Sequence, residues 1–339
     1  MGLSDLCCFL ASAFPKFLCT YLLLWGYYST IFKVDFVLIQ SNVLRIIIFL
    51  FVSALLILSL VSYYLVVLVK PGSPLEYPSL CRPDYKEGDI INPPSFLVDS
   101  SVTVTHDGVY RFCRMCKVWK PDRCHHCSSC NRCILRMDHH CPWFSECIGF
   151  RNHKFFIQFL GYSALFCIII ILVTGWANYG FFISETLPMD EFSFHVLFAF
   201  IMSVIFGLCL TVFSIFTDYQ LLKNLTTIES YESQSYRYRQ NSHTLGNLFD
   251  IGARRNWGSI MGDSVLEWLL PIRKISVRGS LYNDGLRYEV NERLYRKLRE
   301  DAVIQERLSN ELQNYKIRQN KVREDAVRPF LADVRDSFS

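Results

Sequence analysis

The chain has 339 residues, of which 51% are apolar, 15% aromatic and 19% charged, and its formal charge is +4. Globular proteins average about a quarter charged residues, and the high apolar share excludes an intrinsically disordered chain and a small disulfide-rich secreted protein. The weak positive charge is spread over many segments, which argues against a nucleic-acid partner. Because the apolar residues gather in four long runs, the sequence predicts an all-α, multi-pass membrane protein.

The first two runs lie within residues 1–69. They predict spans at 14–32 and at 46–69, and the second contains no charged residue. Each is long enough for a helix rising 1.5 Å per residue to cross a hydrocarbon core of about 30 Å. The opening residues lack the basic region of a cleaved signal peptide, so we expect the first span to be retained. Cys7 and Cys8 precede it and are candidate acceptors of acylation.

Residues 70–154 form a cysteine-rich loop. Two C-x2-C pairs, Cys113/Cys116 and Cys127/Cys130, have the spacing with which one turn offers two thiolates to zinc. The loop therefore predicts a metal-binding domain. Two closed sites use eight ligands, so four of the candidates are spare, and spacing alone does not identify them. The candidates are Cys113, Cys116, Cys124, Cys127, Cys130, Cys133, Cys141 and Cys147, with His125, His126, His139 and His140.

Within this loop, Asp138, His139, His140 and Cys141 are consecutive. In an extended segment successive side chains point to opposite faces, so one histidine can face a metal while the other faces a catalytic site. A cysteine beside a histidine and an aspartate has the parts of an activated nucleophile. The same four residues also suit zinc ligands or the groups that support them, and composition leaves both interpretations open.

The last two predicted spans, 155–183 and 192–217, contain no Asp, Glu, Lys or Arg. The loop 70–154 holds 12 Lys and Arg residues and the tail from 218 holds 20, whereas 33–42 holds one and 184–191 none. This excess predicts that both termini and the cysteine-rich loop face the cytoplasm, where disulfides are rare.

Cys141 lies 14 residues before Phe155, close to the membrane surface. Moving a palmitoyl chain of roughly 14 methylenes out of hydrocarbon costs on the order of 11 kcal/mol, so a lipid substrate favours chemistry at this height.

The tail, 218–339, is the least informative region. Leu286, Val290, Leu294 and Leu298 recur at steps of four in the charged segment 286–328. This spacing predicts an amphipathic helix, either solvated or partner-binding.

The segment from Cys113 to Phe156 resembles the cysteine-rich domain of the DHHC protein S-acyltransferases. It follows their pattern C-x2-C-x3-K-P-x-R-x2-H-C-x2-C-x2-C-x4-D-H-H-C-x5-C-x4-N-x3-F without a gap. The four spans, with this loop between the second and third, are also similar to that family. So are Thr226-Thr227-Ile228-Glu229, which match a T-T-x-E motif, and NLFDIG at 247–252. The following WGSIMGDSVLEWLLPI resembles fungal members, among them vacuolar ones.

The chain departs from the family in two places. Lys70-Pro71-Gly72 stands where relatives usually have Asp-Pro-Gly. Phe144, Ser145 and Glu146 occupy positions often filled by Val and Asn, so Glu146 adds a carboxylate near Cys141.

The resemblance implies an activity and its cofactors. The protein would be a palmitoyltransferase that takes an acyl group from fatty acyl-CoA, stores it as a thioester on Cys141, and passes it to cysteines of cytoplasm-facing proteins. His139 would be the general base and Asp138 would orient it. Two structural Zn²⁺ ions would be bound, one by Cys113, Cys116, His126 and Cys133, the other by Cys127, Cys130, His140 and Cys147.

The resemblance also implies the surroundings of the reaction. Trp143 would lie near the thioester. The anionic CoA phosphates require cations, and the candidates are Lys154, Arg151, Arg136 and Lys223; each of them also suits a side chain that only extends to the membrane interface. The protein is expected in an endomembrane, the vacuole membrane first and the Golgi as the alternative. Two other functions fit a zinc-binding membrane protein: a RING-like ubiquitin ligase and a non-catalytic scaffold. A RING would need another C-x2-C pair after Cys147, but the later cysteines, Cys167 and Cys209, lie inside predicted spans.

Overall fold

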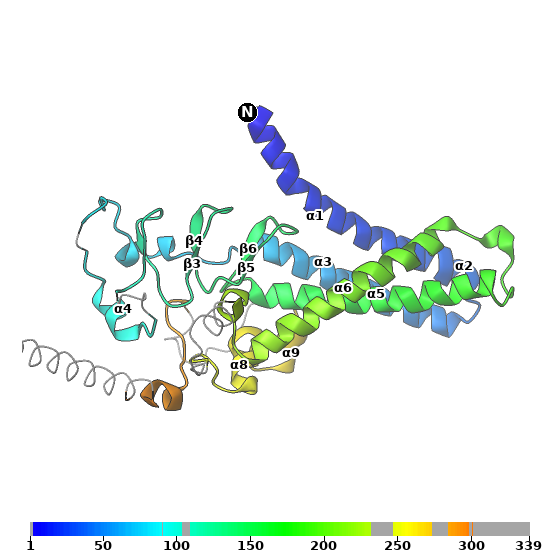
Figure 1. The fold of residues 1–339 in the computed structure, drawn as a ribbon. Coiled ribbons are helices and arrows are strands. Elements are labelled where there is room, and N and C mark those ends of the chain that lie inside the picture. Colours follow the sequence, from blue (N-terminus) through cyan, green and yellow to red (C-terminus); the bar gives the residue numbers. More distant parts are fainter. Residues whose placement is uncertain are drawn as a thin grey trace, which may run out of the picture. The chain divides into compact units, whose positions relative to one another are not determined.

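The computed structural model describes residues 3–89, 91–103, 109–231, 247–272, 284–297 and 300. The chain divides into two units, Met1–Glu289 and Val290–Ser339. The first unit holds the long helices, which run beside one another, and a group of small β-hairpins near one end of them (Figure 1). Its long helices are α1 (Leu3–Thr30), α3 (Asn42–Leu68), α5 (His153–Phe182) and α6 (Phe194–Leu222).

Among the described residues, α3, α5 and α6 are long and apolar enough to cross a membrane. They coincide with the second, third and fourth predicted spans, and each begins and ends within five residues of the predicted bounds. The first predicted span falls on α1 and the π-helical segment Ile31–Asp35 that follows it, before the short α2 (Phe36–Leu38). In α5 56% of the apolar window is buried, against 22% in α3 and α6. Helix α5 is therefore the central helix of the group.

Local signals set the helix ends near the loop. Helix α3 begins after Ser41, whose side chain accepts a hydrogen bond from the backbone N–H of Leu44. It ends just before Lys70 and Pro71, because the ring of a proline excludes a helical conformation at the residue before it. Helix α5 begins after Asn152, whose side chain binds the backbone of Gly149, Cys147 and Val66. These bonds fix the third hairpin to the starting point of the central helix.

The cysteine-rich loop contains three antiparallel hairpins. They pair β1 (Phe112–Cys113) with β2 (Val118–Trp119), β3 (His125–Cys127) with β4 (Arg132–Ile134), and β5 (His139–Cys141) with β6 (Glu146–Ile148). A left-handed residue lies in each turn, at Lys117, Asn131 and Ser145, with φ near +50°. The all-α prediction therefore describes the membrane helices but misses these strands, which are too short to show an alternating pattern. Helix α4 (Ser95–Ser100) precedes them.

After α6, the chain returns to the hairpins and to the central helix. A helical turn at 227–231 follows α6, and α8 (Ala253–Met261) and α9 (Val265–Leu269) come later. Asn256 of α8 is fully buried and donates to the backbone carbonyl of Leu222 at 2.8 Å. The segment is thus tied to the end of α6 (Figure 1).

The amphipathic helix predicted for 286–328 is wrong at its start. Leu286 is not helical; it is buried against the cysteine-rich loop. Helical backbone begins at 292, where the Asn291 side chain accepts a hydrogen bond from Leu294 N–H at 3.2 Å. Burial of Leu286 and the N-cap at Asn291 determine where the helix begins, and the weak four-residue spacing of apolar residues does not. Most of the predicted segment, including Leu298, lies outside the described residues.

Candidate active site and metal centres

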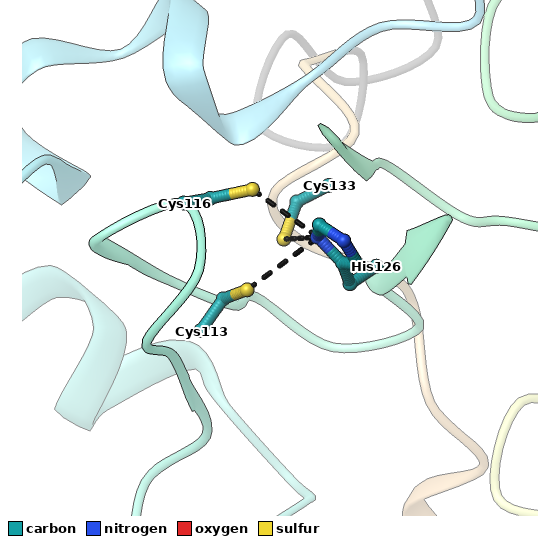
Figure 2. Close-up of side chains that lie close together, drawn as sticks. All are labelled: Cys113, Cys116, His126 and Cys133. Carbon is teal, nitrogen blue, oxygen red and sulfur yellow. Dashed lines mark hydrogen bonds between the residues drawn. The ribbon is translucent and has the colours of Figure 1, made fainter. Parts of the chain in front are cut away.

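Two groups of cysteine and histidine side chains converge in the hairpins. In each, the four possible ligand atoms lie within 4.8 Å of one another. In the first group, His126 Nδ1 is 3.6, 3.2 and 4.0 Å from the sulfurs of Cys113, Cys116 and Cys133 (Figure 2). The second group consists of Cys127, Cys130, His140 and Cys147. These are the two sets that the family resemblance implies.

The groups fit zinc. A tetrahedral ion about 2.3 Å from sulfur and 2.0–2.1 Å from nitrogen keeps its ligand atoms roughly 3.5–3.8 Å apart. His140 Nδ1 lies 3.7, 3.4 and 3.7 Å from the sulfurs of Cys127, Cys130 and Cys147, and the last two sulfurs are 3.5 Å apart. Each group has three thiols and one imidazole. Such a donor set suits a closed structural site that could hold one metal ion.

The hairpins repeat every 14 residues, and this period separates Cys141 from the metal groups. Cys113 and Cys127 each open a C-x2-C pair, and Cys141 stands 14 residues after Cys127. The second cysteine of that third pair is replaced by Phe144. Cys141 therefore occupies a ligand position whose partner thiol is missing. The repeat is a sequence signal that distinguishes Cys141 from the ligands; it does not apply to Cys124, which also lies outside both groups.

Phe144 has a packing role instead. Its ring lies 4.8 Å from the ring of Tyr63 and 5.4 Å from that of Phe159, measured between centroids. The Tyr63 hydroxyl donates to the backbone carbonyl of Trp143 at 2.8 Å. At the position where the earlier C-x2-C pairs have their second cysteine, the third hairpin thus has a ring that packs it onto α3 and α5.

Asp138, His139 and Cys141 form a connected set. His139 Nδ1 is 2.7 Å from Asp138 Oδ2, and the His139 side chain also hydrogen-bonds to Cys141. Because β5 is extended, His140 points to the second metal group while His139 points away from it. Burial by itself lowers the pKa of His139, but the hydrogen bonds with Asp138 and Cys141 raise it to about 9. The set has the arrangement of a thiol, a base and a residue that orients the base.

Asp138 is fixed by the segment after α6. Thr227 donates to it twice, from the backbone N–H to Oδ1 and from Oγ1 to Oδ2, each at 2.9 Å. Burial favours the neutral acid, but the hydrogen bonds from His139 and Thr227 hold the pKa of Asp138 well below its usual range. Asp138 is therefore ionised and oriented toward His139.

A buried ionic network lies beside this contact, and sequence reasoning gave it no role. Arg123 donates to both carboxylate oxygens of Glu229, at 2.7 and 2.8 Å, and to the side chain and backbone of Asn224. Its guanidinium also lies 4.5 Å from the ring centroid of Phe249. Despite burial, the pairing with Arg123 lowers the pKa of Glu229. The network ties the start of the second hairpin to the T-T-x-E segment. In the sequence, the arginine of the K-P-x-R motif was the one signal from which this network could have been inferred.

A cavity of about 420 Å³ opens at Cys141 and runs between α1, α5 and α6. On α5 its lining extends from Phe156 to Ile170, which spans about 21 Å at 1.5 Å per residue. One leaflet of a bilayer holds an acyl chain in about 15 Å, half of the hydrocarbon core. The lining of the cavity is almost entirely apolar, and Trp143 forms part of it. The cavity thus has the chemistry and length that a fatty acyl chain requires.

The four cations assigned to CoA do not gather at this cavity. Among the described residues, its lining includes no lysine or arginine. Arg136 is buried against His153 and Asn224, and it borders a separate polar cavity of about 130 Å³. Arg151 pairs with Glu76 at 2.6 Å, Lys154 donates to the backbone of Ile272, and Lys223 is exposed.

Comparison with known proteins gives the family. A sequence model described as DHHC palmitoyltransferase matches residues 107–234. The chain is 37% identical to palmitoyltransferase PFA3 of Candida albicans, over 95% of both chains, and 38% identical to palmitoyltransferase PFA3 of Saccharomyces cerevisiae, over 88% of this chain and 91% of that one. Palmitoyltransferase ZDHHC2 of Danio rerio is 31% identical over 76% of this chain and 73% of its own. These similarities displace the ubiquitin-ligase and scaffold alternatives: the chain belongs to the DHHC palmitoyltransferases, multi-pass membrane proteins that act as protein S-acyltransferases.

Proposed function

We propose that Cys141 is the nucleophile that carries the acyl group from donor to acceptor. Its position supports this proposal. The thiol is 6% exposed, lies outside both metal groups, contacts His139 and borders the apolar cavity. A thiol placed where an acyl chain ends can attack the thioester carbonyl of that chain.

The reaction then has two steps, with fatty acyl-CoA as the donor. Before the first step His139 takes the thiol proton of Cys141, which its raised pKa favours. The sulfur of Cys141 then bonds to the acyl carbon while the carbon–sulfur bond to CoA breaks, and His139 passes the proton to the leaving sulfur. In the second, a cysteine thiol of a cytoplasm-facing protein attacks the acyl-Cys141 thioester. His139 takes the incoming proton and passes it to Cys141, which is restored. Asp138, held by Thr227, keeps His139 oriented throughout.

We assign one structural Zn²⁺ to each metal group, with Cys113, Cys116, His126 and Cys133 as one ligand set and Cys127, Cys130, His140 and Cys147 as the other. With four protein ligands, zinc supplies a cross-link and has no open position for a reacting water. Each set joins the C-x2-C pair of one hairpin to the histidine and last cysteine of the next. The three hairpins are thereby held in series, which fixes the height of Cys141.

The cavity supports a palmitoyl-length acyl group, and Trp143, which is 49% exposed at its border, is placed beside the thioester. Of the four cations assigned to CoA, Arg151 and Lys223 have exposed charged groups that suit the phosphates. Arg136 and Lys154 are buried with protein partners, so we assign them a structural role instead.

We further propose that α1 is a fourth span, with both termini in the cytoplasm. Ser145 in the third hairpin donates to the backbone carbonyl of Ser12 in α1 at 2.8 Å, and α1 supplies Cys19 to Gly26 of the cavity lining. The excess of Lys and Arg in 70–154 and 218–339 supports this orientation. We place the protein in the vacuole membrane, with the Golgi as the alternative, because its C-terminal segment resembles that of vacuolar fungal members.

The test uses the full-length chain in lipid nanodiscs with an alkyne-labelled palmitoyl-CoA. The wild type is expected to take up a hydroxylamine-sensitive label, and Cys141→Ala to lose it while keeping two zinc ions per chain. Cys124→Ala, a buried cysteine of the same domain outside both metal groups, should keep both. A label that persists in Cys141→Ala, or a zinc count that falls with Cys141, would contradict the nucleophile assignment.

A further inference from the structure

The short helix α9 and the residues after it present an apolar surface that the active site does not use. Val265, Leu266 and Leu269 on α9 are 59%, 67% and 55% exposed, and Leu270 and Ile272, which follow, are 42% and 37% exposed. We call these five residues the α9 patch. Such a continuous group of large apolar side chains marks an interaction surface.

The opposite side of α9 is firmly attached to the protein. Glu267 is 3% exposed and accepts hydrogen bonds from the backbone N–H groups of Asp263 and Ser264. Trp268 donates from its ring to the carbonyl of Gly262, and its ring packs edge-on against Trp257 at 6.2 Å. The orientation of α9 is therefore fixed, and the α9 patch faces outward as a rigid surface.

The attachment also shows where α9 lies along the central membrane helix. The carbonyls of Trp268 and Leu270 each accept a hydrogen bond from Gln158 Nε2 at 2.9 Å, and the carbonyl of Leu269 accepts one from the hydroxyl of Tyr162. Gln158 and Tyr162 lie five and nine residues into α5, or about 8 and 14 Å along its axis from His153. Figure 1 shows α9 beside this end of α5.

These bonds have a specific meaning at a membrane. The last carbonyls of a helix have no partner within it, and in lipid each must be satisfied by protein because water is absent. Long polar side chains from a membrane helix supply the partners here. Lys154, at the start of the same helix, does so for the carbonyl of Ile272 at 2.8 Å. In water, the carbonyls at this helix end would need no such protein partners.

The α9 patch also continues a lipid-facing side of α5. Tyr162 and Leu165, three residues apart, share one face of that helix, and Leu172 and Trp176 extend it at helical spacing. Leu165, Leu172 and Trp176 are 48%, 63% and 49% exposed. Helix α9 thus covers Tyr162, the polar residue at the start of this face of α5, while the apolar residues that follow on the same face remain exposed to the acyl chains.

From these observations we infer that the α9 patch is a membrane contact: Val265, Leu266, Leu269, Leu270 and Ile272 are inserted into the cytoplasmic leaflet, at the boundary of headgroups and acyl chains. Interfacial helices bury their apolar face about 5–10 Å below that boundary. Tyr162 lies about 14 Å along α5 from His153, but helical side chains lean toward the helix N-terminus. Its hydroxyl therefore contacts α9 at a depth close to that range. Arg273 and Lys274 come next in the sequence, as suits a segment that leaves an anionic membrane surface. This inference does not depend on the proposed nucleophile.

The test places a genetically encoded fluorescent amino acid at position 266 of the full-length chain in nanodiscs. A second sample carries it at position 115, where Met115 is 77% exposed on the first hairpin. We expect lipid brominated near the headgroup end of its chain to quench position 266 at least threefold more than position 115, and aqueous iodide to give the reverse order. Position 269 should behave like 266.

Two outcomes would overturn the inference. Quenching of position 266 by iodide and not by brominated lipid would show that the patch faces water. Protection from both quenchers would show that another protein, such as a second copy of the chain, covers it. Zinc content and a single elution peak in size-exclusion chromatography show that each labelled protein is folded, and position 269 repeats the measurement if 266 does not express.

Discussion

The ammonium of Lys70 lies 2.8 Å from the carboxylate of Glu146. This contact joins the segment after α3 to β6, where Glu146 pairs with Cys141 across the third hairpin. Both residues depart from the usual family pattern, Lys70 from an aspartate and Glu146 from a position often filled by asparagine. Arg132 binds the other oxygen of Glu146 at 2.6 Å, and the two cations lower the pKa of this carboxylate despite burial. The added negative charge near Cys141 is therefore neutralised by contacts within the protein.

This pair predicts an asymmetric mutational effect. Lys70→Ala removes a side chain that is 60% exposed, so the free energy of unfolding should fall by less than about 1 kcal/mol. Glu146→Ala leaves Arg132 without its partner and should cost about 1–3 kcal/mol. The exchange Lys70→Glu with Glu146→Lys should recover part of the self-acylation that Lys70→Glu alone loses. Thermal stability and self-acylation of the wild type, Lys70→Glu, Glu146→Lys and the double variant measure the coupling, and strictly additive effects would show that the contact contributes nothing.

The hydrogen bonds from Thr227 to Asp138 predict a positioning effect on catalysis. Thr227→Val keeps the backbone donor but loses the hydroxyl bound to Oδ2. A hydrogen bond to a charged group contributes about 1.5–3 kcal/mol, so the rate of self-acylation should fall roughly tenfold or more. Thr227→Ser should restore it. Because Thr227 does not line the acyl cavity, the KM for acyl-CoA should stay unchanged, and a change confined to KM would contradict the assigned role.

The buried pair of Arg123 and Glu229 predicts a large loss of stability and an acid dependence. Arg123→Met leaves the carboxylate of Glu229, which is only 17% exposed, without its guanidinium partner, and this should cost about 3–5 kcal/mol. Arg114→Met breaks an exposed pair with Glu87 and should cost less than about 1 kcal/mol.

The folded-state pKa of Glu229 lies below its ordinary value of 4.5, so the pairing is fully present above pH 4.5 and is lost as the pH falls through the folded value. Comparing unfolding of the wild type and Glu229→Gln against pH tests this directly. If both lose stability in parallel below pH 4.5, Glu229 is not responsible.

The metal groups predict distinct zinc counts. Cys133→Ser removes a ligand of the first group and should reduce bound zinc from two ions to one, with loss of the folded loop, because binding and folding of such sites are coupled. Cys81→Ser, in the same loop but outside both groups, should keep two. Elemental analysis of the purified proteins decides the matter; two ions in Cys133→Ser would remove that residue from the ligand set.

The far end of the cavity predicts a change in chain-length preference. At Gly26 an added Cβ would lie 3.0 Å from Ile170 Cδ1, so Gly26→Leu should occupy the end of the cavity. Excluding two methylenes, at about 0.8 kcal/mol each, should shift preference roughly tenfold toward shorter acyl-CoA. Competition between acyl-CoAs of different length, read by mass spectrometry of the acyl-enzyme, measures the shift. Gly161→Ala, where an added Cβ meets nothing within 4 Å, should leave the preference unchanged.

The sequence by itself determined the features that local physics dictates. Long apolar runs require helices in a membrane, so three spans could be located within a few residues, and the C-x2-C spacing announced metal binding. The resemblance supplied the ligand sets, because so many fixed positions over 44 residues leave little freedom. The sequence also contains a signal that sets Cys141 apart from the ligands: the 14-residue repeat from Cys113 through Cys127 to Cys141, with Phe144 in place of a second cysteine.

The tertiary structure alone decided which distant residues meet. No local pattern places Thr227 on Asp138, Arg123 on Glu229, or Lys70 on Glu146, since these pairs are 76 to 106 residues apart and depend on how the helices and hairpins pack. The same holds for the cations expected at the CoA site, two of which are buried with protein partners. Charge can be read from a sequence, but whether a charged group faces a ligand, another residue or lipid depends on burial, and burial is a property of the folded chain.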